Sequence, residues 1–238
     1  MNKFGLLVAV TAICSLSSVL AETCTRDANS LFRGIDFVDM RDECVTETEE
    51  QIKKEITASL KYLSMAAYFA KDSVNRPGFA KLFFDSASEE REHAYKLIEY
   101  LSMRGRYLRQ KDKNSWKSTI PNFDISSLVK DSENLNVMGV TLSDLTPAAD
   151  AKTTSGLIAL QNALKLETAV TKSIRNLVVK CEGEPFNHYH FVDYLTAEFL
   201  EEQYKGQRDL AGKISTLGKM VQNQGAELAD FLFDKQLL

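Results

Sequence analysis

Four long stretches of the sequence repeat apolar side chains at intervals of three and four residues, which is the spacing of one face of an α-helix. They are expected to form helices at 47–72, 77–105, 156–181 and 188–217 or beyond, and a shorter apolar stretch follows at 228–233. The 238 residues include only 4 prolines and 11 glycines, too few for a strand-rich fold with many tight turns. The sequence therefore predicts an all-α protein, a four-helix bundle with a short fifth C-terminal helix.

The connection between the second and third predicted helices is long and has no sustained helical period. It covers residues 106–152 and contains the isolated prolines Pro121 and Pro147. Such a length is unusual inside a compact domain, and short helices are expected within it, for example at 125–129. A connection of this length can cross the bundle from end to end, so the two helices that it joins are expected to run parallel.

The first 21 residues have the pattern of a secretory signal peptide. Lys3 supplies the positive start, an apolar run begins at Gly5, and Ala21 ends a small-residue cleavage site. The alternative is an N-terminal anchor helix. No later segment has enough consecutive apolar residues to span a membrane, so no membrane attachment is expected after cleavage. We therefore expect a protein of the secretory pathway (ER and Golgi) and the extracellular fluid, with residues 22–45 as a polar N-terminal arm.

In a secreted protein, the cysteines are expected to form disulfides. Cys14 would leave with the signal peptide, and Cys24, Cys44 and Cys181 would remain in an oxidising compartment. An odd number suggests one internal bridge and one thiol for a partner chain. The alternative is three unpaired buried thiols.

Polar residues interrupt the apolar face of every long predicted helix. Three or four converging carboxylates would repel one another in a core unless a cation neutralised them. The net charge of −4 argues against a nucleic-acid-binding protein. The charged groups that indicate a function are instead the acids on the inward faces of the predicted helices. In chain order, the inward polar residues are Glu55, Tyr62, Glu90, His93, Glu167, Glu202 and Gln203.

Glu90 and His93 have the Glu-x-x-His spacing, which places both ligand atoms on one helical face. Oxygen-rich ligation with one imidazole suits iron or manganese better than structural zinc, and two such metals can share one bridging ligand. A single motif of this kind also occurs by chance, residues 89–92 could be a solvated charge run, and Tyr62 could be a core aromatic. Inward polar residues on four separate helices favour the metal site, and a secreted helical signalling bundle would need none of them.

Several segments resemble ferritin, and with the signal peptide and the cysteine-bearing arm they resemble the heavy-chain type secreted by insects. The resemblance covers most of 46–238 outside the long connection, which is longer than is usual in the family. It implies one ferritin-like diiron domain over 46–238, in an up-down-down-up bundle. The segments that carry it are Tyr62–Met65, Asn75–Ala80, Ser88–Ala94, Ala163–Glu167, Asp193–Leu195, Glu202–Gln203 and Leu228–Lys235.

The resemblance also implies a ferroxidase, an enzyme that oxidises Fe(II) with O2 at a dinuclear iron centre. It assigns Glu55 and His93 to the first metal, Glu90 as the bridge and Glu167 to the second metal. Tyr62 and Gln203 match the family's site tyrosine and glutamine. The product would be a ferric mineral inside a hollow cage of twenty-four subunits, built with light-chain-type partners. The alternative is a non-catalytic structural cage subunit or iron carrier.

Further positions follow from the same resemblance. Glu89 and Glu92 match acids that help to nucleate mineral, and Asp193 matches the first acid of the three-fold channel, where Thr196 replaces the second. The start of the first helix and the end of the third are neighbours in a ferritin-like bundle, which predicts a Cys44–Cys181 bridge. Cys24 is then left for an interchain bond.

Overall fold

The computed structural model describes residues 40–104, 134–147, 152–183 and 187–238. The predicted signal peptide, most of the N-terminal arm with Cys24, and the short helix expected at 125–129 lie outside these residues. No helix among the described residues is long and apolar enough to cross a membrane. The helices are α2 (Asp42–Ala70), α3 (Pro77–Met103), α5 (Ser155–Glu182), α6 (Tyr189–Tyr194), the π-helical η4 (Leu195–Leu200), α7 (Glu201–Gln224) and α8 (Ala226–Gln236).

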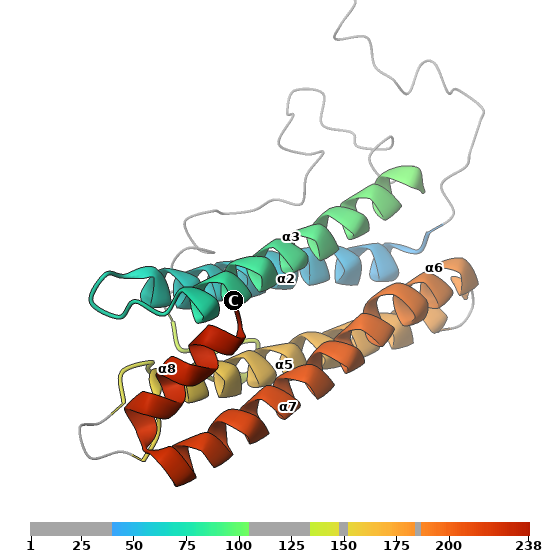
Figure 1. Cartoon of the computed structure of the whole chain (residues 1–238). Helices are drawn as coiled ribbons and strands as arrows, with labels where there is room; N and C mark the ends of the chain where they lie inside the picture. Colours follow the sequence, from blue (N-terminus) through green and yellow to red (C-terminus); the bar gives the residue numbers. More distant parts are fainter. Residues whose placement is uncertain (1–39, 105–133, 148–151, 184–186) are drawn as a thin grey trace, which may run out of the picture.

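Figure 1 shows the bundle as two antiparallel pairs, α2 with α3 and α5 with the long helix made of α6, η4 and α7. In the same view α3 and α5 run in one direction and α2 and α7 in the other, with α8 lying across one end. The predicted up-down-down-up bundle with its short fifth helix is confirmed. Its apolar interior includes a stack of aromatic rings, in which the Phe69 ring lies 5.0 Å from that of Phe79 and 5.8 Å from that of Phe83.

Helix α2 begins five residues earlier than the apolar period predicts, at Asp42 rather than at residue 47. Asp42 and Glu43 lie in its first turn, where negative side chains interact favourably with the partial positive charge of a helix N-terminus. Cys44 is fully buried there and forms a disulfide with Cys181 in the last turn of α5. The last residues of the predicted arm therefore belong to the bundle, and the bridge joins the two helices that the family resemblance implied.

Part of the long connection forms a β-hairpin that the sequence reasoning did not predict. Strands β1 (Asn136–Val137) and β2 (Val140–Thr141) pair antiparallel through Met138 and Gly139, whose φ angles are 47° and 76°. Positive φ at both positions suits a two-residue hairpin turn, and glycine adopts it without strain. The sequence analysis assigned no strand within 106–152, because the Val and Thr flanks of this turn are too short to show a strand period.

The fourth helix is continuous but contains a π-helical segment, η4. A π-turn inserts an extra residue and changes which side chains face inward after it. Leu195, Phe199 and Gln203 follow at four-residue intervals and are all buried. The segment therefore carries the inward face of α6 into that of α7 next to the polar centre described below.

Helix α8 is attached through carboxylates that cap two other helices. Asp234 is fully buried, and its Oδ1 accepts hydrogen bonds from the backbone N–H groups of Gly78 at 2.8 Å and Phe79 at 3.1 Å, in the first turn of α3. Asp230 Oδ1 accepts from the backbone N–H of Gly156, in the first turn of α5, at 3.2 Å. Because α3 and α5 are parallel, their N-termini lie at the same end, and one short helix supplies acids to both.

Replacing the Asp234 cap is expected to destabilise the fold. Asp234→Ala removes an acceptor for two buried N–H groups, and we expect a loss of about 2 kcal/mol in the free energy of unfolding. Asp234→Asn keeps an acceptor oxygen and should lose less. Guanidinium unfolding followed by circular dichroism measures both. Glu227→Ala, an exposed position on the same helix, is the control, and equal losses for Asp234→Ala and this control would contradict the capping role.

Removing the Cys44–Cys181 bridge is also expected to destabilise the bundle. The bridge closes a loop with a sequence separation of 137 residues, so it restricts the unfolded chain strongly. The double replacement Cys44→Ser with Cys181→Ser should lower the free energy of unfolding by about 2–5 kcal/mol. Denaturant midpoints before and after reduction provide the measurement. Cys24→Ser leaves this bridge intact and should match the unchanged chain, whereas a loss of the same size would argue that the bridge is not the stabilising element.

Candidate metal centre

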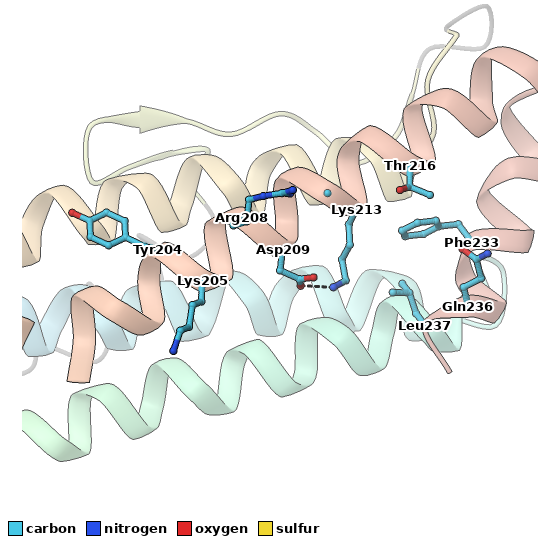
Figure 2. Close-up of a pocket in the computed structure, with 10 residues that line it drawn as sticks. Tyr204, Lys205, Arg208, Asp209, Lys213, Thr216, Phe233, Gln236 and Leu237 are labelled. Atoms are coloured by element: carbon cyan, nitrogen blue, oxygen red, sulfur yellow. Dashed lines mark hydrogen bonds and ion pairs between the residues drawn. The ribbon is translucent and has the colours of Figure 1, made fainter. Parts of the chain in front are cut away.

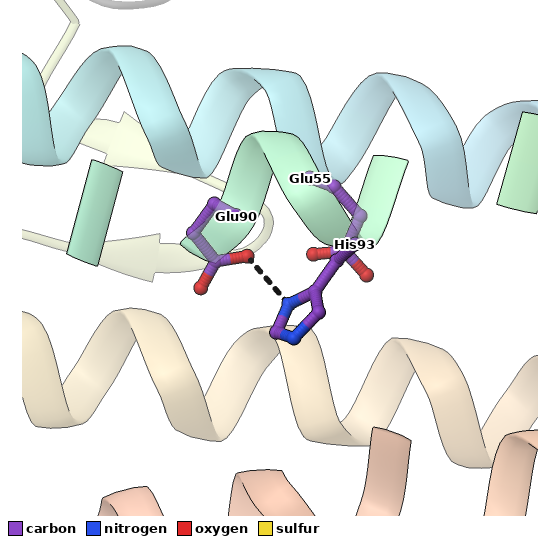
Figure 3. Close-up of side chains that lie close together, drawn as sticks. All are labelled: Glu55, Glu90 and His93. Carbon is purple, nitrogen blue, oxygen red and sulfur yellow. Dashed lines mark ion pairs between the residues drawn. The ribbon is translucent and has the colours of Figure 1, made fainter. Parts of the chain in front are cut away.

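Three metal-ligating side chains meet in the interior between α2 and α3. Glu55 comes from α2, while Glu90 and His93 are one turn apart on α3, and their side chains converge in Figure 3. One ligand atom from each lies within 4.8 Å of the others, and His93 Nδ1 is 3.6 Å from Glu90 Oε2. The three residues are 0 %, 2 % and 4 % exposed, so bulk water does not solvate their polar atoms. This triad unites three of the predicted metal ligands.

The triad also holds polar atoms that make no hydrogen bond within the protein. Glu55 Oε2, Glu90 Oε2 and His93 Nδ1 are buried and accept or donate no hydrogen bond. An unpaired buried polar group costs about 1–3 kcal/mol, and more when it is charged. A cation bound between these atoms would remove that cost. Two carboxylate oxygens and one imidazole nitrogen are a donor set that fits iron or manganese.

Glu167 of α5 approaches the triad from the opposite side of the bundle. The Tyr62 hydroxyl of α2 donates a hydrogen bond to its Oε1. Glu167 lies outside the group of three, but its charge acts directly on Glu90. Gln203 of α7 is buried, and its Oε1 accepts a hydrogen bond from Thr171 Oγ1 at 2.9 Å. The six predicted centre residues therefore come from three parts of the bundle, the α2–α3 pair, α5 and α7, and line one polar region.

The electrostatics of the acids are those of a site that needs a cation. Burial raises the pKa of Glu90 well above its ordinary value, and the negative charges of Glu167 and Glu55 raise it further. Burial also raises the pKa of Glu167, although the hydrogen bond from Tyr62 opposes the shift. The pKa of Tyr62 is raised well above 10.0, chiefly by burial and then by the Glu167 charge, so its hydroxyl stays a donor. Without a metal, Glu90 and Glu167 therefore bind protons more tightly than free glutamates do.

Comparisons with known proteins agree with this fold and site. A family profile, Ferritin-like domain, matches residues 46–220. The chain belongs to the ferritin family. It is 46% identical over 234 residues to the ferritin heavy chain of Papilio xuthus, covering 98% of this chain and 95% of that protein. It is 50% identical over 202 residues to the ferritin heavy chain of Drosophila melanogaster, covering 85% and 84%.

A solved structure extends the comparison to three dimensions. The crystal structure of secreted ferritin from Trichoplusia ni matches this ferritin chain with a TM-score of 0.64 and 48% sequence identity. The match covers 85% of this chain and 91% of that chain. The resemblance noted in the sequence, to ferritin and to the insect heavy-chain type, is thereby confirmed.

His93 of this ferritin is held from its far side by Glu202. His93 Nε2 lies 3.2 Å from Glu202 Oε2 and donates a hydrogen bond to this carboxylate. Nδ1 is then the ring nitrogen whose lone pair can bind a metal ion. The Phe199 ring of η4 packs at 5.3 Å from the imidazole. The Glu202 side chain is 49% exposed, so the prediction that it faces inward is wrong. At this point α7 contributes the buried amide of Gln203, while the half-exposed Glu202 carboxylate reaches the cluster only through His93.

The remaining predicted residues lie outside the triad. Glu89 and Glu92 are exposed on α3. Asp193 is exposed on α6, and Thr196 Oγ1 donates to its backbone carbonyl at 2.9 Å. Their predicted roles in mineral growth and in the channel concern surfaces of this ferritin and stay predictions.

Sequence reasoning missed Gln51, which contacts the site directly. It is buried on α2, and its Nε2 donates to Glu55 Oε1 at 2.7 Å. The signal was present, because Gln51 lies four residues before Glu55 and therefore on the same helical face. Ser173 of α5, which donates to Gln51, was missed because only the tertiary packing brings it to that point.

A surface cavity of about 810 Å³ lies along α7 and α8, and Figure 2 shows the side chains that line it. Lys205, Arg208 and Lys213 line it together with Asp209, which forms an ion pair with Lys213. Three basic groups against one acid disfavour a cation there. Of the two, the buried cluster is therefore the candidate metal centre.

The raised pKa of Glu90 predicts a pH dependence in the metal-free protein. The folded state binds this proton more tightly than the unfolded chain, whose glutamate has the ordinary pKa of 4.5. The resulting stabilisation is fully present below pH 4.5 and is lost as the pH rises toward the raised pKa. The wild type should therefore lose thermal stability relative to Glu90→Gln as the pH increases above 4.5. Melting temperatures of both proteins in a chelator test this, and a pH-independent difference would contradict it.

Proposed function

We propose that this ferritin chain is a ferroxidase subunit, an enzyme of iron storage and transport that oxidises Fe(II) with O2. The observation that carries the proposal is the convergence of three buried ligand atoms without hydrogen bonds, on Glu55, Glu90 and His93. Their convergence from two helices leaves buried polar atoms unsatisfied at a cost that a bound cation would remove. Two relatives at 46% and 50% identity are named ferritin heavy chain, which agrees with this assignment.

Iron is the substrate, and different side chains would bind each of two Fe(II) ions. Glu55 and His93 would hold the first Fe(II) ion, Glu90 would bridge, and Glu167 would hold the second. Carboxylates bind the harder Fe(III) product more strongly than Fe(II), so the site favours oxidation. Two Fe(II) ions side by side each lose one electron, and together they reduce one O2 molecule by two electrons.

Tyr62 and Gln203 would assist this reaction without being principal ligands. The Tyr62 hydroxyl holds one oxygen of Glu167 and so orients the other oxygen. The Gln203 oxygen is occupied by Thr171 and its amide also bonds to Glu167, which leaves one amide hydrogen to donate to a bound water or to O2. Both groups therefore act on positions and protons around the metal ions.

The oxidised iron would be deposited as ferric mineral inside a hollow cage of twenty-four subunits, formed with copies of this chain and light-chain-type subunits. Glu89 and Glu92 are exposed acids on α3, as mineral nucleation requires. Asp193 is exposed on α6 and would serve as an acid of the channel through which Fe(II) reaches the interior, while Thr196 there carries no charge. No nucleic-acid partner is proposed.

The protein would act in the secretory pathway and the extracellular fluid. Residues 1–21 would be removed as a signal peptide, and Cys24 in the arm would form the interchain disulfide, since Cys44 and Cys181 are already joined. The match to a structure described as secreted ferritin supports this location. An oxidising compartment is also the one in which such bridges persist.

The decisive experiment removes two ligands of the triad. Glu90→Ala with His93→Ala should reduce the fast phase of Fe(II) oxidation more than about 100-fold, since even outer-shell changes at metal sites cost 10–100-fold. Assembly should be unaffected, because both side chains are buried inside the subunit. Stopped-flow absorbance and oxygen consumption measure the oxidation, and size-exclusion chromatography measures the assembly.

The matched control removes an exposed ion pair from the same helix, Lys81→Ala with Asp85→Ala. It should oxidise Fe(II) at the wild-type rate. Fast oxidation that survives in the ligand variant would show that the site is elsewhere. A wild type without any fast phase would instead support the alternative, a non-catalytic cage subunit or iron carrier.

A further inference from the structure

Next to Glu55, a row of hydrogen bonds crosses from α2 to α5. Gln51 Nε2 donates to Glu55 Oε1 at 2.7 Å, and Ser173 Oγ donates to Gln51 Oε1 at 2.5 Å. Lys54 Nζ donates to the same Ser173 oxygen at 2.7 Å and lies 3.7 Å from Glu47. Gln51 is only 1 % exposed and Ser173 is buried, whereas the Lys54 side chain reaches the surface. The row thus connects a half-buried cation to a fully buried carboxylate.

The chemistry of the groups sets the direction of every bond in this row. A lysine ammonium has donors and no acceptor, so the Ser173 oxygen must accept from Lys54. The single hydroxyl hydrogen of Ser173 then points to Gln51, whose oxygen must be the atom facing it. The Gln51 amide hydrogens are therefore turned toward Glu55. The orientation of this amide, which heavy-atom positions alone leave ambiguous, is set by the two ends of the row together, because the Lys54 ammonium only donates and the Glu55 carboxylate only accepts.

The row occupies one oxygen of Glu55 and leaves the other for the triad. Glu55 Oε1 is the acceptor for Gln51, while Oε2 is buried and has no partner. If the row served only to join α2 to α5, every polar atom at its inner end would be expected to be satisfied. The remaining oxygen belongs instead to a side chain whose ligand atom lies within 4.8 Å of those of Glu90 and His93. Its orientation is therefore coupled to the row behind it.

We propose that Lys54, Ser173 and Gln51 form a positioning relay that holds the Glu55 carboxylate for the first Fe(II) ion. The three residues do not touch the metal and act through Glu55. This proposal rests on the proposed function for one point, that the ion bound by Glu55 is Fe(II). Hydrogen-bonded partners behind metal ligands typically change affinity or activity 10–100-fold when they are removed.

The first test interrupts the relay at Ser173 in the full, assembled chain. Ser173→Ala should raise the Fe(II) concentration for half-maximal anaerobic binding by about tenfold. The concentration dependence of the oxidation rate should shift in the same way, with a smaller change in the maximal rate, because the relay acts on binding. Ser173→Thr keeps the hydroxyl and should restore binding close to the wild-type value. Unchanged binding in a folded Ser173→Ala protein would overturn the proposal, as would a failure of the threonine variant to restore it.

The second test does not require a change in the interior. Lys54→Met removes the donor that sets the direction of the relay, and Lys53→Met removes the same charge from the neighbouring residue, which pairs only with Glu50 among the described contacts. Lys54→Met should raise the half-saturating Fe(II) concentration, and Lys53→Met should leave it unchanged. Equal effects of the two variants would show that only net charge matters and would overturn the relay, even if Ser173→Ala failed to fold.

The binding measurement separates this proposal from the function on which it rests. A wild type that binds Fe(II) saturably but oxidises it slowly would contradict the ferroxidase assignment. The relay would still be supported if Ser173→Ala and Lys54→Met weakened that binding. A wild type with fast oxidation, whose binding neither variant altered, would retain the ferroxidase assignment and lose the relay.

Discussion

The structure depends on the burial of like-charged carboxylates in a helical core. Glu55 and Glu90 are almost inaccessible to solvent, and Glu167 lies close enough to add its charge to theirs. Such an arrangement is stable only if protons or cations neutralise it, and only if rigid helices prevent the acids from turning away. The raised pKa of Glu90 favours neutralisation by a proton. The buried oxygens of Glu55 and Glu90 that make no hydrogen bond could instead bind a cation.

The helical frame holds these acids because both ends of the bundle are tied. At one end the Cys44–Cys181 bridge joins the start of α2 to the end of α5. At the other end Asp230 and Asp234 of α8 cap the first turns of the parallel helices α5 and α3. The helices that carry Glu55, Glu90 and Glu167 are thereby anchored at points outside the polar centre. An extra contact inside the centre would compete with metal binding.

Much of the fold and of the centre could be read from helical periodicity and from the ferritin resemblance. Apolar residues three and four apart locate the helices to within a few residues, and polar residues on the same faces single out Glu55, Glu90 and His93. The earlier start of α2 was missed because the acids and the buried cysteine of its first turn carry no apolar period. The hairpin around Gly139 was missed because its strands are two residues long. Glu202 was misplaced because it lies three residues after Phe199 and Gln203 lies four, and both spacings fit one helical face. Only the packing around η4 decides that Gln203 is the buried one.

The sequence by itself determined which residues are able to bind a metal and which helices carry them, because these follow from side-chain chemistry and from the period of an α-helix. The tertiary structure alone decided how those side chains are oriented. Ser173 is more than a hundred positions from Gln51 along the chain, and no local pattern relates them. Their contact exists because α2 packs against α5, and that packing determines which Glu55 oxygen faces the triad. Long-range packing sets this geometry, whereas local spacing sets only the direction in which a side chain leaves its helix.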